Sequence, residues 1–330
     1  MRHPIAVIGS NSFSGASFVD HCLTQGYEVV GISRSDEYHP VFLPYKQNPN
    51  VSAFRFIKAD LNHDLDTLMA ELDAAKPSVV VNFASQSMVA QSWKYPAHWF
   101  QTNVVATVKL HDLLRQCDYL DKYVHISTPE VYGTCTGLIR ESTDYHPSTP
   151  YAVSRAAADM SLMTFVQNYH FPVVFTRAAN VYGPSQQLYR IIPRTILYFL
   201  TSRKLQLHGG GHSIRSFIDI ADVSNGTLKA ALVGKPGDIF HLSTERLVSI
   251  RDLVQMIANI IGVRFDDFVD VAEERPGKDA AYMMDSGKAK GELGWAPTVS
   301  LEAGIEKTIR WVVDNLSVLK QLPSEYIHKA

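Results

Sequence analysis

The first 178 residues alternate between short apolar segments and longer amphipathic ones, and this alternation limits the folds open to the chain. The apolar segments predict strands at 5–8, 28–32, 53–57, 78–81, 123–126 and 172–176. The segments between them predict helices at 13–24, 64–75, 99–116 and 150–169. Strands that are apolar on both faces and separated by helices are typical of a parallel sheet covered on both sides. We therefore expect a doubly wound α/β domain of the Rossmann type over residues 1–178.

The second half of the chain has a different pattern. Its loops are longer and rich in Gly, Pro, His and Arg, and helices are predicted at 191–201, 250–261 and 301–315. Residues 179–330 are expected to form a smaller mixed α/β domain that binds the substrate. Residues 216–245 are expected to return to the first domain.

Composition excludes several classes of protein. The 330 residues are 46% hydrophobic and carry a formal net charge of −2, which suits a globular protein and not a nucleic-acid binder. No apolar run approaches the roughly 18 residues of a membrane span, and the run at 5–8 is too short for a signal peptide. The three cysteines are widely separated and the histidines form no HExxH pattern. We therefore expect a cytoplasmic protein with no metal and no membrane contact.

The first predicted strand runs directly into a glycine-containing turn and then into a helix. The turn reads Gly9-Ser10-Asn11-Ser12-Phe13-Ser14-Gly15. Glycine in such a turn lets the backbone approach a pyrophosphate, whose charge then lies at the helix N-terminus. This order of strand, turn and helix predicts a dinucleotide site. The predicted contacts are Gly9, Asn11, Ser12, Phe13 and Gly15.

The ends of the next two predicted strands bear on the choice of cofactor. An acid after the second strand would bind the adenosine ribose and select NAD, but this chain has Ser33 and Arg34 there. A hydroxyl and a guanidinium suit a 2′-phosphate, so the sequence favours NADP slightly over NAD. A solvated surface arginine is the alternative interpretation. Asp60 and Leu61, after the third strand, are expected beside the adenine.

Two further segments carry residues with catalytic chemistry. Thr128 follows the fifth predicted strand, and Tyr151 and Arg155 lie four residues apart at the start of a predicted helix. That spacing places both side chains on one helical face, where the cation would lower the tyrosine pKa from about 10. With the Thr128 hydroxyl on the same substrate oxygen, the group would act as an alcohol-oxidising base beside a nicotinamide.

These features resemble the extended short-chain dehydrogenase/reductase family and, within it, the nucleotide-sugar 4,6-dehydratases. The resemblance covers nearly the whole chain. Its later motifs look most like dTDP-glucose 4,6-dehydratases, while Ser33-Arg34 and Ala84–Ser87 look more like GDP-mannose 4,6-dehydratases. The matching segments are 82–87, 102–103, 127–133, 151–155, 177–184, 191–193, 209–215, 220–223, 275–279 and 292–297.

The resemblance implies a reaction and roles for four catalytic residues: Thr128, Glu130, Tyr151 and Arg155. Tyr151 would remove the C4 hydroxyl proton while hydride passes to the cofactor. Glu130 would then abstract the C5 proton. Loss of the C6 hydroxyl as water and return of hydride to C6 would give a 4-keto-6-deoxy sugar.

The resemblance also implies binding residues and an assembly. Further NAD(P) contacts would come from Phe83, Ala84, Ser85 and Asn103, together with Tyr151 and Arg155. A nucleotide-diphosphate sugar would be held by Ser87, Thr128, Asn180, Arg190, Ile192, Arg215 and Arg275. Helices 99–116 and 150–169 would pair across a twofold axis and form a homodimer.

Three positions depart from the family pattern. Ser12 replaces the middle glycine of the turn, Pro129 replaces an aspartate, and Arg155 replaces the lysine of the YxxxK motif. Proline cannot protonate a leaving hydroxide, so Glu130 would serve as both base and acid. Arginine keeps the positive charge but cannot relay a proton.

Other functions stay open from sequence. A nucleotide-sugar epimerase or a UDP-glucuronate decarboxylase-like enzyme would use the same fold, although a simple 4-epimerase needs no base at position 130. A non-catalytic NAD(P)-binding regulatory protein is a further alternative. The nucleotide base and the hexose are not determined.

Overall fold

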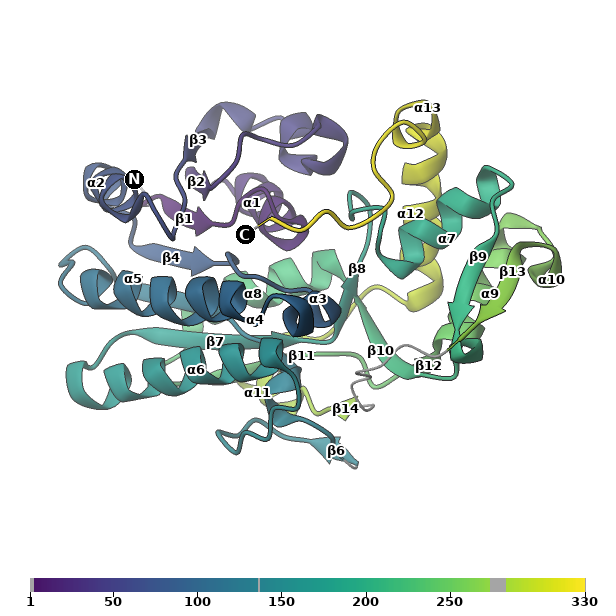
Figure 1. The fold of residues 1–330 in the computed structure, drawn as a ribbon. Coiled ribbons are helices and arrows are strands. Elements are labelled where there is room, and N and C mark those ends of the chain that lie inside the picture. Colours follow the sequence, from purple (N-terminus) through teal and green to yellow (C-terminus); the bar gives the residue numbers. More distant parts are fainter. Residues whose placement is uncertain (1–2, 136, 274–282, 330) are drawn as a thin grey trace.

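The computed structural model describes residues 3–135, 137–273 and 283–329, and a seven-stranded parallel sheet lies at its centre (Figure 1). The strand order is β11-β7-β5-β4-β1-β2-β3, and every neighbouring pair is parallel. This order confirms the predicted Rossmann-type α/β class. The strands are β1 (Ile5–Ile8), β2 (Val29–Ser33), β3 (Phe54–Lys58), β4 (Val79–Asn82), β5 (Lys122–Ile126), β7 (Val173–Ala178) and β11 (Ile239–Leu242).

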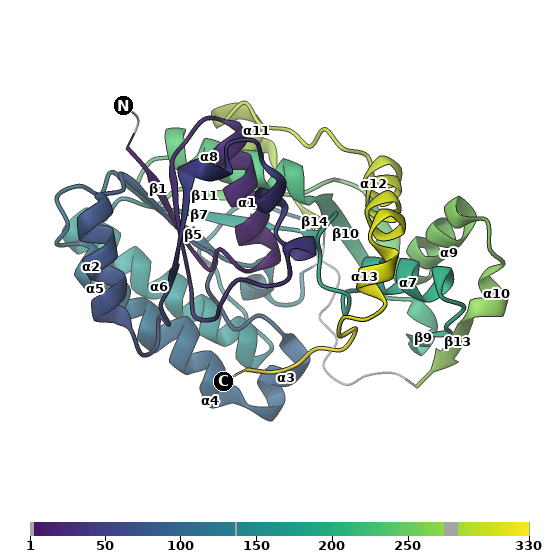
Figure 2. The same cartoon turned by 90° about the horizontal axis from the view of Figure 1, so that it is seen from above.

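The central strands are buried on both faces because helices cover each side of the sheet (Figure 2). Side chains alternate between faces along a strand. In β1, Ile5 and Val7 pack with α1 (Phe13–Thr24) and α8 (Ile220–Val233). On the other face, Ala6 and Ile8 belong to a core whose helices are α2 (Leu65–Ala75), α5 (Thr107–Leu114) and α6 (Pro150–Tyr169).

A second hydrophobic core lies beside the sheet, and we call its buried residues the second core. Three amphipathic helices supply most of them, including Ile196 of α7, Ile257 of α9 and Ile305 of α12. The α9 and α12 helices begin at the serine caps Ser249 and Ser300, each of which accepts a backbone N–H bond. The helices are α7 (Ile191–Leu200), α9 (Ile250–Ile261), α12 (Leu301–Asp314) and the short α10 (Phe265–Phe268) and α13 (Leu316–Leu319).

Three small sheets accompany these cores. The chain passes from β10, which pairs with β8, through α8 to β11 at the edge of the central sheet. Residues 216–245 therefore contribute to both parts of the molecule. The small sheets contain β8 (Asn180–Tyr182), β10 (Ile214–Asp219) and β12 (Leu247–Ser249), then β9 (Leu205–His208) with β13 (Val269–Ala272), and β6 (Leu138–Ile139) with β14 (Met283–Met284).

The α8 helix is joined to the segment that precedes α12 by one buried carboxylate. Asp222 accepts hydrogen bonds from the Thr298 backbone N–H and hydroxyl and from the Val299 N–H, at 2.7–3.0 Å. The Trp295 indole N–H donates to the Asp222 carbonyl at 2.9 Å. The short helix α11 (Gly287–Glu292) packs on β11 nearby.

Most predicted elements are confirmed within one or two residues, but the helix predicted at 99–116 is not continuous. The structure has α4 (Pro96–Phe100), a π-helical turn over 101–106 and then α5. The Thr107 hydroxyl donates to the Thr102 carbonyl at 2.9 Å within this turn. The largest elements absent from the sequence prediction are α8 and β11, which complete the central sheet. The short helix α3 (Val89–Lys94) and the 3-10 helices Pro40–Phe42, Pro44–Gln47 and Val51–Ala53 were also not predicted.

Two findings concern classes of site. Across residues 3–135, 137–273 and 283–329, no helix is long and apolar enough to cross a bilayer. Over the same residues, no group of three or more His, Cys, Asp and Glu side chains is arranged to hold a metal ion.

Candidate active site

A pocket of about 160 Å³ lies at the carboxyl ends of the central strands. Ten of the predicted cofactor contacts line it. They are Gly9, Asn11, Ser12, Ser33, Arg34, Asp60, Leu61, Phe83, Ala84 and Ser85. Tyr38, Asn62, Gln86 and Thr102 also line the pocket without having been predicted as cofactor contacts.

The glycine turn is tightly packed against the start of the pocket. Gly9 has φ +86°, and a Cβ there would lie 2.6 Å from the Ala84 nitrogen. A Cβ on Gly15 would lie 2.2 Å from the Gly9 carbonyl oxygen. Ser12 fits because it caps α1: its hydroxyl donates to Gly9 O at 2.7 Å and accepts from Gly15 N at 3.0 Å. Both retained glycines are therefore required, while the middle position accepts serine.

The end of β2 presents hydroxyl and cationic groups to the pocket. The Ser33 hydroxyl accepts the Asn11 backbone N–H at 2.9 Å. The carboxylate of Asp36, the next acid along the chain, is 84% exposed and is bound by Lys58 at 2.9 Å. The pocket residues Ser33 and Arg34 thus lie where the sequence places them, and Asp36 is engaged elsewhere.

Two buried oxygen atoms of the pocket suit a ligand with hydrogen-bond donors. Asn11 Oδ1 and Asn62 Oδ1 both belong to pocket-lining residues, and neither has a hydrogen-bond partner in the protein. A buried acceptor without a partner costs about 1–3 kcal/mol. Ribose hydroxyls and an adenine amine would satisfy such acceptors. The tight glycine turn and these two oxygens fit a dinucleotide.

Asn103 supports the pocket wall from behind. It is buried in the π-helical turn, where its Oδ1 accepts from Gln86 N at 2.8 Å. Its Nδ2 donates to Gln86 O at 3.0 Å and to the Ser154 hydroxyl at 2.9 Å. The side chain therefore fixes the loop after β4 to α6.

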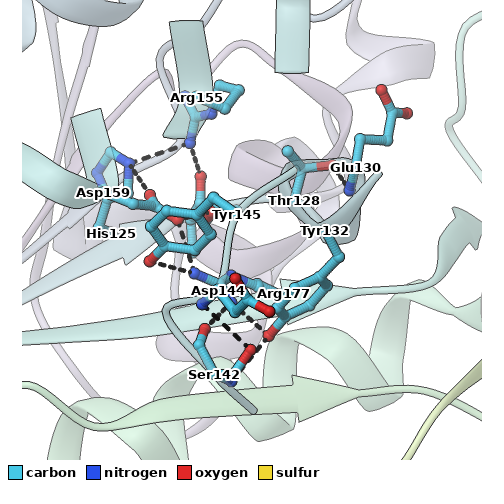
Figure 3. Close-up of polar contacts among 12 residues, drawn as sticks. His125, Thr128, Glu130, Tyr132, Ser142, Asp144, Tyr145, Arg155, Asp159 and Arg177 are labelled. Atoms are coloured by element: carbon cyan, nitrogen blue, oxygen red, sulfur yellow. Dashed lines mark hydrogen bonds and ion pairs between the residues drawn. The ribbon is translucent and has the colours of Figure 1, made fainter. Parts of the chain in front are cut away.

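Tyr151, Thr128 and Glu130 meet just past the end of β5, the strand next to β4, and the residues that follow β4 line the pocket. Thr149 caps α6 and accepts the Ala152 N–H, so Tyr151 lies in the first helical turn. Burial, followed by the Glu130 carboxylate, raises the pKa of Tyr151 to about 12, against the lowering effects of Arg155, Thr128 and Arg190. Thr128 Oγ1 also accepts the Glu130 N–H at 3.3 Å. In Figure 3 the Glu130 carboxyl group points away from the buried polar cluster.

Arg155 is directed toward the end of β5 (Figure 3). Its side chain is buried, and Nη2 donates to the Ile126 carbonyl and to His125 Nε2, the latter at 3.2 Å. Burial and the Arg155 charge lower the pKa of His125 well below its ordinary value. His125 is therefore a neutral acceptor for the guanidinium. The positive charge acts on Tyr151 from the interior of the protein.

Asp159 and Arg177 form a buried ion pair beneath this site, and neither was predicted as a functional residue. Asp159 Oδ2 accepts from Arg177 Nη2 at 2.9 Å and from the Ser127 hydroxyl at 2.5 Å. Arg177 also donates to the Tyr145 hydroxyl at 2.9 Å and to the Tyr132 hydroxyl. The pair holds β5, α6 and β7 together. Positions 151, 155 and 159 lie on one helical face, and this spacing was the available signal.

The predicted substrate residues lie in different settings. Arg190 precedes α7, and its charge acts on Tyr151. Asn180 donates to the Ser216 carbonyl at 3.1 Å, and Arg215 donates to the Ile214 carbonyl at 2.8 Å. Ser87 is exposed, whereas the Ile192 side chain is buried in the second core. Arg275 lies outside the described residues.

Comparison with known proteins finds relatives that match most of the chain. A family model described as GDP-mannose 4,6 dehydratase matches residues 7–308. The dTDP-glucose 4,6-dehydratase of Xanthomonas campestris is 30% identical, covering 94% of this chain and 93% of its own length. The human dTDP-D-glucose 4,6-dehydratase is 34% identical, covering 88% of this chain and 83% of its own length.

Solved structures agree with these relatives. A dTDP-glucose 4,6-dehydratase from Streptomyces venezuelae with NAD bound has a TM-score of 0.89 and 29% identity, covering 98% of this chain and 100% of that one. The UDP-glucose 4-epimerase of Thermotoga maritima with UDP-glucose has a TM-score of 0.86 and 26% identity, covering 95% and 99%. This chain belongs to the GDP-mannose 4,6-dehydratase family, within the extended short-chain dehydrogenase/reductases that act as nucleotide-sugar dehydratases and epimerases.

Proposed function

We propose that this protein is an NAD(P)-dependent nucleotide-sugar 4,6-dehydratase, a lyase that removes water from a nucleotide-diphosphate hexose. The observation that carries the proposal is that Tyr151 and Glu130 converge on Thr128. The Thr128 hydroxyl is hydrogen-bonded to Tyr151 and accepts the Glu130 N–H at 3.3 Å. An oxidation base and a second carboxylate base in one site suit oxidation followed by elimination. The relatives named above carry the same activity in their names.

Tyr151 and Thr128 would carry out the oxidation. The Tyr151 phenolate takes the proton of the C4 hydroxyl, and the Thr128 hydroxyl donates a hydrogen bond to the same oxygen. A bound oxidised dinucleotide would accept and later return the hydride and would add a positive charge that lowers the Tyr151 pKa. Arg155 contributes charge from behind the tyrosine.

Glu130 would carry out the elimination. The new 4-ketone acidifies the C5 proton, which the Glu130 carboxylate removes. The C6 hydroxyl then leaves, and the protonated Glu130 supplies the proton that makes it water. One carboxyl group can serve both steps because the proton it gains is the proton it gives up. Return of hydride to C6 then requires a proton at C5, and this proton balances the one that Tyr151 removed from the C4 hydroxyl. Pro129, the neighbouring residue, has no proton to offer.

We infer a preference for NADP over NAD from the end of β2. Ser33 and Arg34 line the pocket, while Lys58 holds the Asp36 carboxylate. A hydroxyl and a guanidinium suit the 2′-phosphate, and no carboxylate among the pocket-lining residues at this strand end competes with it. The opposite expectation, a preference for NAD, comes from the similar solved structures that contain NAD.

We also infer a homodimer through α4, α5 and α6. The α5 and α6 helices cover the sheet with their buried faces, and large apolar side chains are exposed on α4, the π-helical turn and α6. The exposed fractions are 38% for Phe100, 42% for Val105, 38% for Val153 and 58% for Met160. A second copy of the chain would cover them. Light scattering at micromolar concentration should give twice the monomer mass, and a monomer mass would refute the dimer.

The experiment that tests the function is a substrate panel. The purified protein is incubated with NAD or NADP and with dTDP-glucose, UDP-glucose, GDP-mannose or UDP-glucuronate. The masses of the products are then measured by mass spectrometry. Dehydration removes about 18 mass units, decarboxylation removes about 44, and epimerisation leaves the mass unchanged. Unchanged mass with altered stereochemistry would favour a 4-epimerase, to which the fold is also similar.

A further inference from the structure

The segment that follows α13 returns across the molecule to the dinucleotide pocket (Figures 1 and 2). We call residues 323–329 the C-terminal strap. Along it, the side chains at 324, 326 and 328 are partly buried, whereas those at 323, 325, 327 and 329 are exposed. This period of two is that of an extended chain lying on a surface.

The end of the strap joins two walls of the pocket. The Lys329 carbonyl accepts from Gln86 Nε2 at 2.7 Å and from Arg34 Nη2 at 3.3 Å. Gln86 follows β4 and Arg34 follows β2, and both line the pocket. The Lys329 ammonium also lies 5.4 Å from the ring centre of Tyr38, another lining residue. One backbone carbonyl therefore joins lining residues that follow two different strands.

His328 anchors the strap beside the pocket. Its ring stacks with those of Tyr95, His98 and Trp99, with centroid distances of 5.0–5.2 Å and interplanar angles of 4–12°. His328 Nε2 and His98 Nδ1 also share a hydrogen bond of 2.9 Å. An aromatic pair contributes about 0.5–1.5 kcal/mol. Several such contacts around one ring can hold the strap in place.

The beginning of the strap is attached to the second core. Arg194 of α7 donates to the Ser324 carbonyl at 2.7 Å and pairs with the Glu325 carboxylate at 2.8 Å. The Tyr326 ring packs edge-on against Tyr189 at 5.3 Å. The strap is thus fastened at both ends, and it connects α7 to the cofactor pocket.

We propose that the C-terminal strap is part of the dinucleotide site and slows release of the bound cofactor. This proposal rests on the proposed function only in taking the pocket as a dinucleotide site. A volume of about 160 Å³ stays open with the strap in place, so the strap does not fill the pocket. It contacts the pocket through the side chains of three lining residues, Gln86, Arg34 and Tyr38. A ligand beneath it leaves only after the Lys329 and His328 contacts have broken.

Slow cofactor release is compatible with the proposed reaction, because the reaction regenerates its own cofactor. Hydride is taken from C4 and returned to C6, so the cofactor ends each cycle in its starting oxidation state. An enzyme of this kind has no need to exchange its dinucleotide between turnovers. Slow release then costs no rate and avoids loss of a reduced cofactor in mid-cycle.

The test measures cofactor release without any sugar nucleotide. The protein is loaded with NADH or NADPH, excess oxidised cofactor is added, and the loss of bound-cofactor fluorescence gives the dissociation rate. His328→Ala should raise that rate about tenfold, the equivalent of roughly 1.4 kcal/mol of lost contacts. Deletion of residues 323–330 should raise it at least as much. Lys320→Ala, an exposed change just before the strap, should stay within twofold of the parent.

Two other results would contradict the proposal that the strap slows cofactor release. A rate within twofold of the parent in His328→Ala and in the deletion would overturn the proposal. Tighter cofactor binding after deletion would also overturn it, because the strap would then be a plug. If the deletion unfolds by circular dichroism, His328→Ala decides alone.

Product analysis separates this proposal from the dehydratase assignment. Faster cofactor release in the variants, together with no dehydration by the parent protein, would reject the dehydratase assignment and support the strap proposal. Normal dehydration by the parent protein, together with unchanged cofactor release in the variants, would support the dehydratase assignment and reject the strap proposal. A parent protein that binds neither NADH nor NADPH would overturn both.

Discussion

The guanidinium of Arg155 donates a hydrogen bond to the backbone carbonyl of Ile126, the last residue of β5. Arg155 follows Tyr151 by one helical turn, at the position where the family has a lysine. The longer side chain is therefore engaged by the sheet, and its charge reaches Tyr151 through the protein.

Arg155→Lys should preserve or raise turnover, whereas Arg155→Met should lower it by about 10²-fold. Lysine keeps the cation, but methionine removes an effect that lowers the Tyr151 pKa. That pKa therefore rises in Arg155→Met, and the rise of activity with pH should move to higher pH. The kcat–pH profile measures this shift. An unshifted profile in Arg155→Met would show that the charge does not act on the tyrosine.

Tyr151→Phe and Glu130→Gln should stop the reaction at different stages. Tyr151→Phe removes the oxidation base, so neither reduced cofactor nor product should form. Glu130→Gln removes the elimination base, so reduced cofactor should accumulate without loss of water. Each change should cost about 10²–10⁴ in product formation. Thr128→Val, which removes one hydrogen bond, should give a milder form of the Tyr151 defect. Native turnover by Glu130→Gln would contradict the dehydratase mechanism.

Arg34→Ala should weaken NADP binding more than NAD binding, by about tenfold in the ratio of dissociation constants. The strap contact of Arg34 is lost equally for both cofactors, so the ratio isolates the effect of the 2′-phosphate. Isothermal titration measures both constants. Arg55→Ala, on an exposed arginine paired with Glu71, controls for the loss of one positive charge. Equal losses for NAD and NADP would remove the predicted preference.

Three buried histidines should make the fold sensitive to acid. Burial is the main cause that lowers the pKa of His111 and His241 to about 3 and that of His125 well below its ordinary value of 6.5. Below pH 6.5 the unfolded chain therefore binds more protons than the folded one, and stability falls as pH falls.

The expected slope is about 1.4 kcal/mol per pH unit for each histidine, or roughly 4 for the three. Urea unfolding between about pH 6 and pH 4 measures it. His111→Gln should reduce the slope by about one proton, and His63→Gln, at an exposed position, should not change it. An equal slope in His111→Gln and the parent would contradict this account.

Asp159→Asn should destabilise the fold by about 3–5 kcal/mol, because Arg177 would then be a buried charge without its counter-ion. The exposed pair of Asp112 with Arg115 provides a matched control. Asp112→Asn should cost less than about 1 kcal/mol. Chemical denaturation compares the two. Similar small losses for both would show that the buried pair contributes little.

The sequence predicts six of the seven strands of the central sheet, all except β11, for a physical reason. Strands that are buried on both faces must be apolar throughout. Short runs of consecutive apolar residues, such as those of β1 and β4, therefore indicate buried strands. Helix starts were equally visible, since Thr149, Ser249 and Ser300 are caps that act within three residues. These strands and helix starts depend on residues that are neighbours in the sequence, so the sequence predicts them.

Features that depend on distant contacts could not be predicted. The π-helical turn at 101–106 interrupts a pattern that is otherwise helical, and the short strand β8 exists only through its pairing with β10. The direction of Arg155 depends on acceptors in β5. The strap is a polar segment with no periodic signal, and its place becomes visible only when Lys329 and Gln86 are seen together.

The buried carboxylate of Asp222 has a consequence for how ligands enter. It holds α8, a helix of the central sheet, to Thr298 and Val299 at the entrance to α12. Separating the sheet from the second core as rigid bodies would break these bonds inside the protein and leave the carboxylate unsolvated. Hinge closure is therefore disfavoured, and structures with and without ligand should superpose over both cores. We therefore expect ligand entry to depend on chain segments beside the pocket, such as the C-terminal strap, and not on separation of the two cores.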